Sequence, residues 1–171
     1  MPVDPDFFPS RRAFLKLPGE PKADALRPPW TDEEAVAARC TSCSACVDAC
    51  PESILQTDRQ GRPVVVFDGR ECTFCRKCAE ACEVSVFDLA RPQPWGLKAV
   101  IGEGCLQDHG ISCQLCRDSC PVSAIRVDLG KRPFGRLTID TGLCTGCGAC
   151  LSVCPQEVLS LTDSTSETEA A

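Results

Sequence analysis

Cysteine is the residue type in this chain with the clearest chemical potential, because its thiolate is both a nucleophile and a metal ligand. Sixteen of the 171 residues are cysteine, and they form four groups of four. Three groups follow the spacing CxxCxxCxxxC, and one is stretched to CxxxxxxxCxxCxxxC. The last group runs on as CxxCxxCxxxCP, the pattern with which bacterial proteins hold 4Fe-4S clusters. The groups are Cys40, Cys43, Cys46 and Cys50; Cys72, Cys75, Cys78 and Cys82; Cys105, Cys113, Cys116 and Cys120; and Cys144, Cys147, Cys150 and Cys154.

The spacing also predicts which cysteines share a cluster. In two-cluster proteins, three closely spaced cysteines hold one cluster and the fourth ligates the other. The groups therefore belong in pairs, and pairing them by chain order exchanges the fourth ligand within each half of the chain. The sequence thus predicts four 4Fe-4S clusters, with the iron ligand sets Cys40/Cys43/Cys46/Cys82, Cys72/Cys75/Cys78/Cys50, Cys105/Cys113/Cys116/Cys154 and Cys144/Cys147/Cys150/Cys120.

Disulfides and zinc sites are the alternative uses of so many cysteines. A disulfide framework requires an oxidising compartment and usually a signal peptide, and this N-terminus offers no apolar segment of the required length. Structural zinc usually binds separated CxxC pairs, often with histidine, and the only histidine is His109. Asp108 and His109 lie in the stretched spacer of the third group and could replace a thiolate, although four cysteines are already present there. We expect this spacer to form a surface loop that changes solvent access to its cluster.

Composition and charge limit the core and the classes of partner. The chain has seven Phe, two Trp and no Tyr, too few aromatic side chains for a large core, so bound clusters must replace part of it. The formal net charge is −6, and four oxidised clusters with their thiolates bring it to about −14. Such a charge disfavours nucleic acid and anionic membranes. No apolar run has the length of a transmembrane helix.

The order of the predicted elements indicates an α+β fold of two tandem bacterial-type 2(4Fe-4S) ferredoxin-like modules, stabilised by their clusters. Residues 36–89 form the first module and 98–162 the second, joined by a proline-containing linker at 90–97. We expect an extended arm at 1–35 and a disordered acidic tail at 163–171. Short strands are predicted at 53–56, 63–67, 84–89, 99–101, 124–129, 136–139 and 158–161, with a turn at 58–62 and a short helix at 76–82.

Proline follows the fourth cysteine in three of the four groups, as Pro51, Pro121 and Pro155. Its missing N–H and fixed φ end the short helix that carries that cysteine. Glu83 takes this place after Cys82. We therefore expect the helix end in the second group to be less firmly fixed.

The segment Ser10–Lys16, SRRAFLK, matches the twin-arginine export consensus. A functional export signal continues with an apolar segment, whereas LPGEPKADALRPPW follows here, with two acidic residues and four prolines. We therefore expect a non-exporting segment. Two interpretations stay open: a basic amphipathic element that buries Phe14 and Leu17, or a partner-binding element that uses Arg11, Arg12 and Phe14.

Several segments together make the chain similar to a known family. They are SRRAFL, RPPW at Arg27–Trp30, CTSCSACVDAC, ECTFCRKCAEAC, Trp95, the stretched group ending in CQLCRDSC, and CTGCGACLSVCP. On these segments the chain resembles the NapF family, the ferredoxin-type accessory proteins of periplasmic nitrate reductase systems. The resemblance implies a cytoplasmic protein with four 4Fe-4S clusters. It also implies binding to the catalytic nitrate reductase subunit in its precursor form, before export, and a part in maturing it.

Two functions are compatible with these observations, and neither is enzymatic. The sequence shows no Ser/His/Asp grouping and no phosphate-binding glycine loop beside the cysteines. The first function is a maturation factor that docks on the reductase precursor. The second is a polyferredoxin electron carrier that passes single electrons between redox partners. Both need the same clusters, so cysteine spacing does not separate them.

Overall fold

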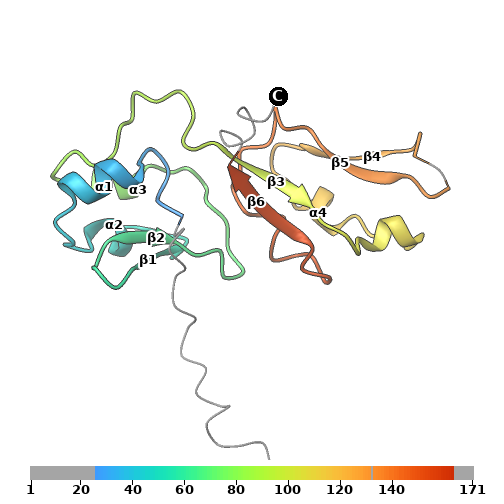
Figure 1. Cartoon of the computed structure of the whole chain (residues 1–171), viewed down its shortest axis with the longest axis horizontal. Coiled ribbons are helices and arrows are strands. Elements are labelled where there is room, and N and C mark those ends of the chain that lie inside the picture. Colours follow the sequence, from blue (N-terminus) through green and yellow to red (C-terminus); the bar gives the residue numbers. More distant parts are fainter. Residues whose placement is uncertain (1–25, 132, 164–171) are drawn as a thin grey trace, which may run out of the picture.

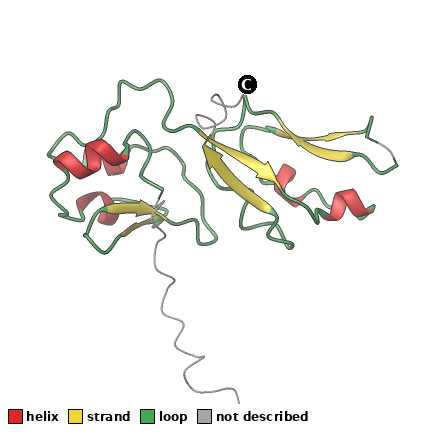
Figure 2. Ribbon diagram, in the orientation of Figure 1, coloured by secondary structure: helices red, strands yellow, loops and turns green. Residues whose placement is uncertain are grey.

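The molecule consists of two modules of short helices and strands joined by a loop. The computed structural model describes residues 26–131 and 133–163. Figures 1 and 2 show the modules side by side along the long axis of the molecule. The first contains α1 (Glu33–Arg39), α2 (Ala45–Asp48), β1 (Leu55–Thr57), β2 (Pro63–Val65) and α3 (Lys77–Glu80). The second contains β3 (Leu97–Ile101), a 3₁₀ helix (Leu106–His109), α4 (Leu115–Asp118), β4 (Ile125–Asp128), β5 (Arg136–Ile139) and β6 (Leu159–Asp163).

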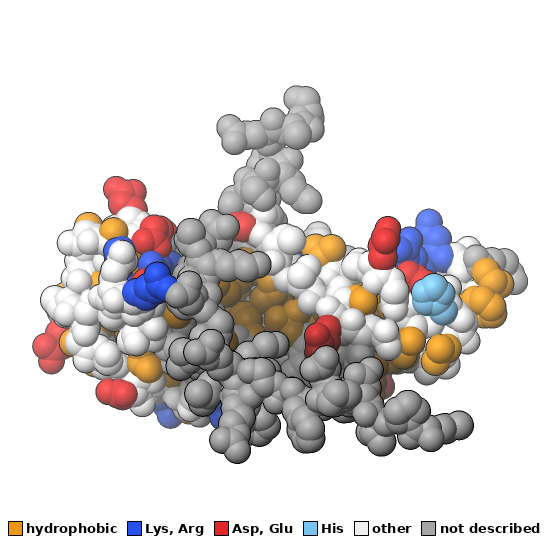
Figure 3. Space-filling model, turned by 60° about the horizontal axis from the view of Figure 1, so that its bottom comes forward, with side chains coloured by type: hydrophobic (Ala, Val, Ile, Leu, Met, Phe, Trp, Pro, Cys, Tyr) orange, Lys and Arg blue, Asp and Glu red, His pale blue; other side chains and the backbone are white. Residues whose placement is uncertain are grey.

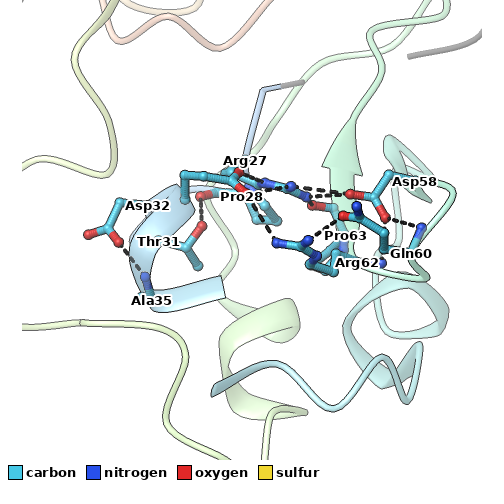
Figure 4. Close-up of polar contacts among 10 residues, drawn as sticks. Arg27, Pro28, Thr31, Asp32, Ala35, Asp58, Gln60, Arg62 and Pro63 are labelled. Carbon is cyan, nitrogen blue, oxygen red and sulfur yellow. Dashed lines mark hydrogen bonds and ion pairs between the residues drawn. The ribbon is translucent and has the colours of Figure 1, made fainter. Parts of the chain in front are cut away.

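β1 and β2 form an antiparallel hairpin whose turn is closed by Asp58. The strands pair with Leu55 opposite Val65. The Asp58 carboxylate accepts hydrogen bonds from the N–H groups of Gln60 and Arg62, each at 2.9 Å (Figure 4). Aspartate commonly closes turns by bonding to the backbone shortly after it. The predicted turn is confirmed, and the two strands lie within two residues of their predicted ranges.

Residues 26–35 pack against the first module, so the predicted extended arm is wrong for this part of the chain. Pro28 is fully buried and Trp30 is 4% exposed. Proline suggested an exposed segment, but its ring is apolar and packs well where no backbone N–H is needed. Residues 1–25, with the SRRAFLK segment, lie outside the described residues.

Polar contacts fix this anchoring segment at both ends. The Arg27 guanidinium donates to the Pro63 carbonyl at 2.9 Å and to the Asp58 carboxylate at 3.2 Å (Figure 4). The Asp32 carboxylate accepts a hydrogen bond from the Ala35 N–H at 2.7 Å and caps α1. A capped helix start satisfies one of the backbone donors that a helix leaves free. The segment therefore enters the module in one defined geometry.

The strand predicted at 84–89 is wrong: this segment is a loop. One backbone bond ties it to the anchoring segment, from the Asp88 N–H to the Trp30 carbonyl at 2.8 Å. A strand requires a continuous ladder of such bonds, and the neighbouring Pro28 and Pro29 have no N–H to donate. The first module thus keeps only its hairpin.

The second module contains two antiparallel strand pairs, β3 with β6 and β4 with β5. The four strands predicted here are confirmed to within two residues, although β3 begins at Leu97 and β6 runs to Asp163. Asp163 was predicted to open the tail; residues 164–171 lie outside the described residues. A buried core lies around these pairs, formed by Ala99, Cys105, Cys116, Ala124, Ile125, Leu137, Cys144 and Cys150. Half of its members are cysteines, so the core and the candidate ligands are partly the same residues.

Candidate iron-sulfur centres

Four cavities in the structure are each lined by four cysteines. About 320 to 390 Å³ in and at the mouth of each cavity is free of protein atoms, part of it open to solvent, and the remaining walls are largely apolar. We number them by the group that supplies three of the cysteines. The first cavity has Cys40, Cys43, Cys46 and Cys82; the second has Cys72, Cys75, Cys78 and Cys50; the third has Cys105, Cys113, Cys116 and Cys154; the fourth has Cys144, Cys147, Cys150 and Cys120. The structure thus brings together the same four sets that the spacing predicts.

In three of the four groups, a short helix carries the third cysteine and ends before the fourth, which lines the cavity of the partner group. In the fourth group, turns at 149–153 take the place of this helix. In the first group, Cys46 lies within α2 and Cys50 lies just after it. α2 packs against α3, and the two helices lie between the first and second cavities, each carrying a cysteine of one cavity and ending before a cysteine of the other. Exchange of a ligand is thus built into this pair of helices.

Left-handed residues bend the compact groups so that three thiols meet at one cavity. The second and fourth residues after the first cysteine have positive φ in all three compact groups. They are Ser42 and Ser44, Phe74 and Arg76, and Gly146 and Gly148. The first two groups show that non-glycine residues can hold this conformation, although it costs of order 1 kcal/mol or more each.

In all four groups, the third residue after the fourth cysteine is also left-handed. These residues are Ser53, Ser85, Ser123 and Glu157, with φ of 50 to 52°. Ser53, Ser123 and Glu157 each donate a backbone hydrogen bond to the carbonyl of the fourth cysteine, at 3.1 Å. Among the described backbone bonds, none joins Ser85 to Cys82. The turn after Glu83 therefore has the shape of the other three but lacks this bond, in line with the looser helix end expected there.

Backbone N–H groups donate to several of the cysteine sulfurs. Three of these donors and sulfurs are Ser42 to Cys40 at 3.4 Å, Ala99 to Cys144 at 3.4 Å, and Ala124 to Cys120 at 3.3 Å. Hydrogen bonds to cluster sulfurs raise the reduction potential by stabilising the more negative state. Two of the three donors serve the fourth cavity.

Burial raises the pKa of several thiols that line the cavities. It raises the pKa of Cys46, Cys72 and Cys116 to about 11, and that of Cys78 and Cys150 to about 12. Without metal these thiols are neutral at physiological pH, and iron binding must therefore release protons. Negative charge on neighbouring thiols contributes to each increase; for Cys72 these neighbours include Cys147 of the other module.

Solvent access differs between the modules. Cys43 and Cys75 in the first module are exposed, whereas Cys105, Cys116, Cys144 and Cys150 in the second are buried. Hydrogen bonding to the Ala45 N–H lowers the pKa of the exposed Cys43. Solvent exposure is one of the properties that set cluster potentials. The two modules therefore offer different environments to chemically similar clusters.

The stretched spacer of the third group folds onto the second module. The 3₁₀ helix occupies it, and Gln107 is buried and donates to the Phe134 carbonyl at 2.8 Å. Asp108 forms an ion pair with Arg136 at 3.4 Å. The residues that line the third cavity do not include Asp108 or His109, so nothing in this geometry supports the replacement of a thiolate by either.

The donor chemistry fits 4Fe-4S clusters. All sixteen cysteines are free thiols. Within the described residues, no three His, Cys, Asp or Glu side chains converge closely enough to hold one metal ion. A 4Fe-4S cube takes one thiolate at each of four iron corners, so its ligands stand further apart than those of a single ion. The four sets have the number and type of donors that a cube requires.

Sequence reasoning missed several residues that form the cavity walls. Trp30 and Phe74 line the second cavity, and their rings meet edge to face at 6.2 Å. Val86 and Phe87 line the first. The RPPW motif supports both the prediction of an extended arm and the family resemblance, whereas its bulky, uncharged residues beside charged ones are the signal that indicates burial. In the described part of the chain, no helix is both long and apolar enough to span a membrane.

The fold and the thiol sets define a dicluster iron-sulfur protein of the ferredoxin type. A family model described as a 4Fe-4S dicluster domain matches residues 39–86 and 111–158, once in each module. The chain is 42% identical over 139 residues to the ferredoxin-type protein NapF of Haemophilus influenzae, covering 81% of this chain and 79% of that protein. It belongs to the NapF family of ferredoxin-type proteins, and the prediction of two tandem dicluster modules is confirmed.

Two further relatives extend the comparison. The ferredoxin-type protein NapF of Escherichia coli K12 is 37% identical over 147 residues, covering 85% of this chain and 90% of that protein. The methylamine utilization ferredoxin-type protein MauM of Methylorubrum extorquens is 32% identical over 161 residues, covering 83% and 73%. The similarity thus spans both modules, and it includes a ferredoxin-type protein named for another process.

Proposed function

We propose that this protein is a cytoplasmic accessory protein that binds four 4Fe-4S clusters and acts in the maturation of the catalytic subunit of periplasmic nitrate reductase before export. The observation that carries the proposal is the set of four cavities, each lined by four thiols, in a chain of the NapF family. The partner is the precursor form of the reductase subunit. The protein has no catalytic residues of its own in this proposal.

The chain's own residues hold and shield the clusters. A bound 4Fe-4S cluster supplies one-electron chemistry. The sixteen cysteines hold the iron, and apolar side chains such as Val86 and Phe87 in the first cavity keep water from it. The backbone donors Ser42, Ala99 and Ala124 adjust the potentials. Holding and tuning four such centres is what the geometry supports best.

The second candidate function is a polyferredoxin that carries single electrons between redox partners. One observation favours it: α2 and α3 pack together between the first and second cavities. Adjacent clusters exchange electrons readily, so paired cavities suit electron transport. A maturation factor acts on the reductase precursor, whereas an electron carrier acts on the assembled reductase.

A deletion strain separates the two functions. If the protein is a maturation factor, its loss leaves reductase that lacks activity or cofactor even when electrons are supplied artificially. If it is a carrier, the reductase is fully assembled and regains activity with an artificial electron donor. The second result would overturn the maturation proposal.

Co-purification tests the proposed partner. A tagged version of this protein should retain the reductase precursor from the cytoplasm and not retain the mature periplasmic enzyme. Iron and acid-labile sulfide in the same preparation should correspond to four clusters per chain. Equal retention of precursor and mature enzyme would contradict a role before export.

A further inference from the structure

The two modules meet at a contact that joins two candidate ligands. The Cys72 N–H donates a hydrogen bond to the Cys147 carbonyl at 2.8 Å. Cys72 lines the second cavity and Cys147 lines the fourth. These two cavities therefore face each other across the junction, and a single backbone hydrogen bond links a ligand of one to a ligand of the other.

Aromatic side chains stabilise this contact between the two modules. The Trp95 ring lies between Phe67 and Phe74, with ring centres at 6.2 and 5.5 Å. Its indole N–H donates to the Thr145 carbonyl at 2.8 Å. Edge-to-face pairs of this kind add stability beyond their buried area. In the face shown in Figure 3, apolar side chains gather in the middle of the molecule, where the modules meet.

Gly148 in the fourth group is needed because the first module approaches so closely. A Cβ at Gly148 would lie 2.4 Å from the Phe67 ring. The equivalent positions in the first two groups carry the side chains of Ser44 and Arg76, with the same positive φ. The cysteine loop itself thus tolerates a side chain at this position, and the close contact between modules is what excludes one at Gly148.

The other two cavities lie on the far sides of their modules. The second cavity adjoins the first across α2 and α3. The fourth adjoins the third around α4 and the turns at 149–153, because the third and fourth cysteines of each group divide between those two cavities, Cys116 and Cys154 in the third, and Cys120 and Cys150 in the fourth. The cavities therefore follow the order first, second, fourth, third.

We propose that electrons cross between the modules at the contact of Cys72 with Cys147, so that the four clusters form one path with the first and third at its ends. This rests on the proposed function only in that four clusters are bound. Starting from a low-potential one-electron donor, the cluster in the second cavity loses one electron as the cluster in the fourth gains one. No bond forms or breaks, and no proton moves.

The test uses the complete iron-loaded protein, reduced with dithionite and studied by electron paramagnetic resonance. In the wild type, reduced clusters of the second and fourth cavities should show magnetic coupling across the junction. Gly148→Ala should lose that coupling, because its Cβ forces the Phe67 ring and the module behind it away. Gly69→Ala is the matched control: Gly69 also has positive φ, and an added Cβ there meets nothing within 4 Å. It should retain the wild-type coupling.

A milder variant decides the question if Gly148→Ala loses iron. Trp95→Phe keeps a ring between Phe67 and Phe74 and removes the hydrogen bond to Thr145. It should weaken the cross-junction coupling at unchanged iron content. Wild-type coupling in an iron-replete Gly148→Ala protein, or in Trp95→Phe if the first variant is iron-poor, would overturn the proposed path. Iron analysis and the deletion strain report separately on the proposed function, which survives that result.

Discussion

In three of the four cysteine groups, a short helix decides which cavity the fourth cysteine lines. Cys46 lies in α2 and lines the first cavity, and Cys50 lies two residues beyond that helix and lines the second. The same division holds for Cys78 and Cys82 at α3. The identity of the ligand therefore depends on local helix geometry. Two cysteines that are four positions apart in the chain thus line different cavities.

Single cysteine substitutions test the exchanged ligands. Cys82→Ala should weaken the cluster held by Cys40, Cys43 and Cys46, and Cys50→Ala should weaken the one held by the second group, because each removes one of four thiolates. Each variant should lose about one quarter of the bound iron. Iron analysis gives the loss, and paramagnetic resonance shows which signal disappears.

The two variants serve as controls for each other. Loss of the same signal from both would contradict the exchange of ligands. Loss of the second group's signal from Cys82→Ala would show that each group holds its own cluster. The structure gathers the four thiols of each set, and these variants test the predicted ligand assignment.

At the level of elements, the anchoring segment at 26–35 takes the place of a strand. Its backbone meets the loop after α3 through Trp30, and its Arg27 reaches the hairpin turn at Asp58. The segment thus joins the loop after α3 to the hairpin of the first module, a connection that paired strands make in the second module. It also supplies Trp30 to the wall of the second cavity.

Removal of the Arg27 side chain should loosen the first module. Arg27 and Asp58 are 10% and 12% exposed, and Arg27→Ala leaves the Asp58 carboxylate and the Pro63 carbonyl without this donor. We expect the free energy of unfolding to fall by about 2 kcal/mol, as for other charged hydrogen bonds. Arg62→Ala is the control, because the Arg62 pair with the 62% exposed Glu33 is solvated and should contribute at most about 1 kcal/mol. Anaerobic urea titration measures both, and equal effects would contradict the anchoring role.

Introducing proline after Cys82 should stabilise the turn that ends α3. Ser85 has the same φ as its counterparts Ser53 and Ser123, so the backbone at this turn matches turns that contain proline. We expect Glu83→Pro to stabilise the protein by about 0.4–1 kcal/mol, by restricting the unfolded chain. The rate of iron loss to a chelator should fall for the clusters that α3 helps to hold. Faster iron loss would show that position 83 cannot adopt the proline conformation.

The sequence was sufficient for features that depend on neighbouring residues and insufficient for those that depend on distant ones. Cysteine spacing and proline positions are local patterns, and such patterns predicted the four cysteine groups, the hairpin turn and the strands of the second module. The lost strand at 84–89 depends on Pro28 and Pro29, more than fifty residues earlier in the chain. The contact of Trp95 with Thr145 is likewise invisible to local periodicity.

At the scale of the whole molecule, the cysteines are structural as well as functional. Four of the eight residues in the buried core of the second module are cysteines that line cavities. In the first module, Ile54, Leu55 and Val65 form the buried cluster at the hairpin, and Trp30, Val36, Val64 and Val86 are buried around it. Cores of this size bury little apolar surface for a chain of 171 residues. Metal binding must therefore contribute much of the folding free energy.

Removal of iron should unfold most of the chain. Anaerobic chelation after oxidation of the clusters should abolish most of the circular dichroism due to helix and strand, because the metal sites organise the chain around them. Reconstitution with iron and sulfide should restore it. A native-like spectrum of the metal-free protein would show that the apolar core is sufficient by itself.

The unequal exposure of the cysteines has a consequence for the behaviour of the protein in air. Cys43 and Cys75 are exposed at the surface of the first module, whereas their counterparts in the second module, Cys113 and Cys147, are partly buried. Molecular oxygen and other small oxidants reach exposed sulfur and iron first. Aerobic ageing should thus proceed from one end of the molecule, and a preparation handled in air will pass through a form whose N-terminal half is damaged while its C-terminal half still carries iron.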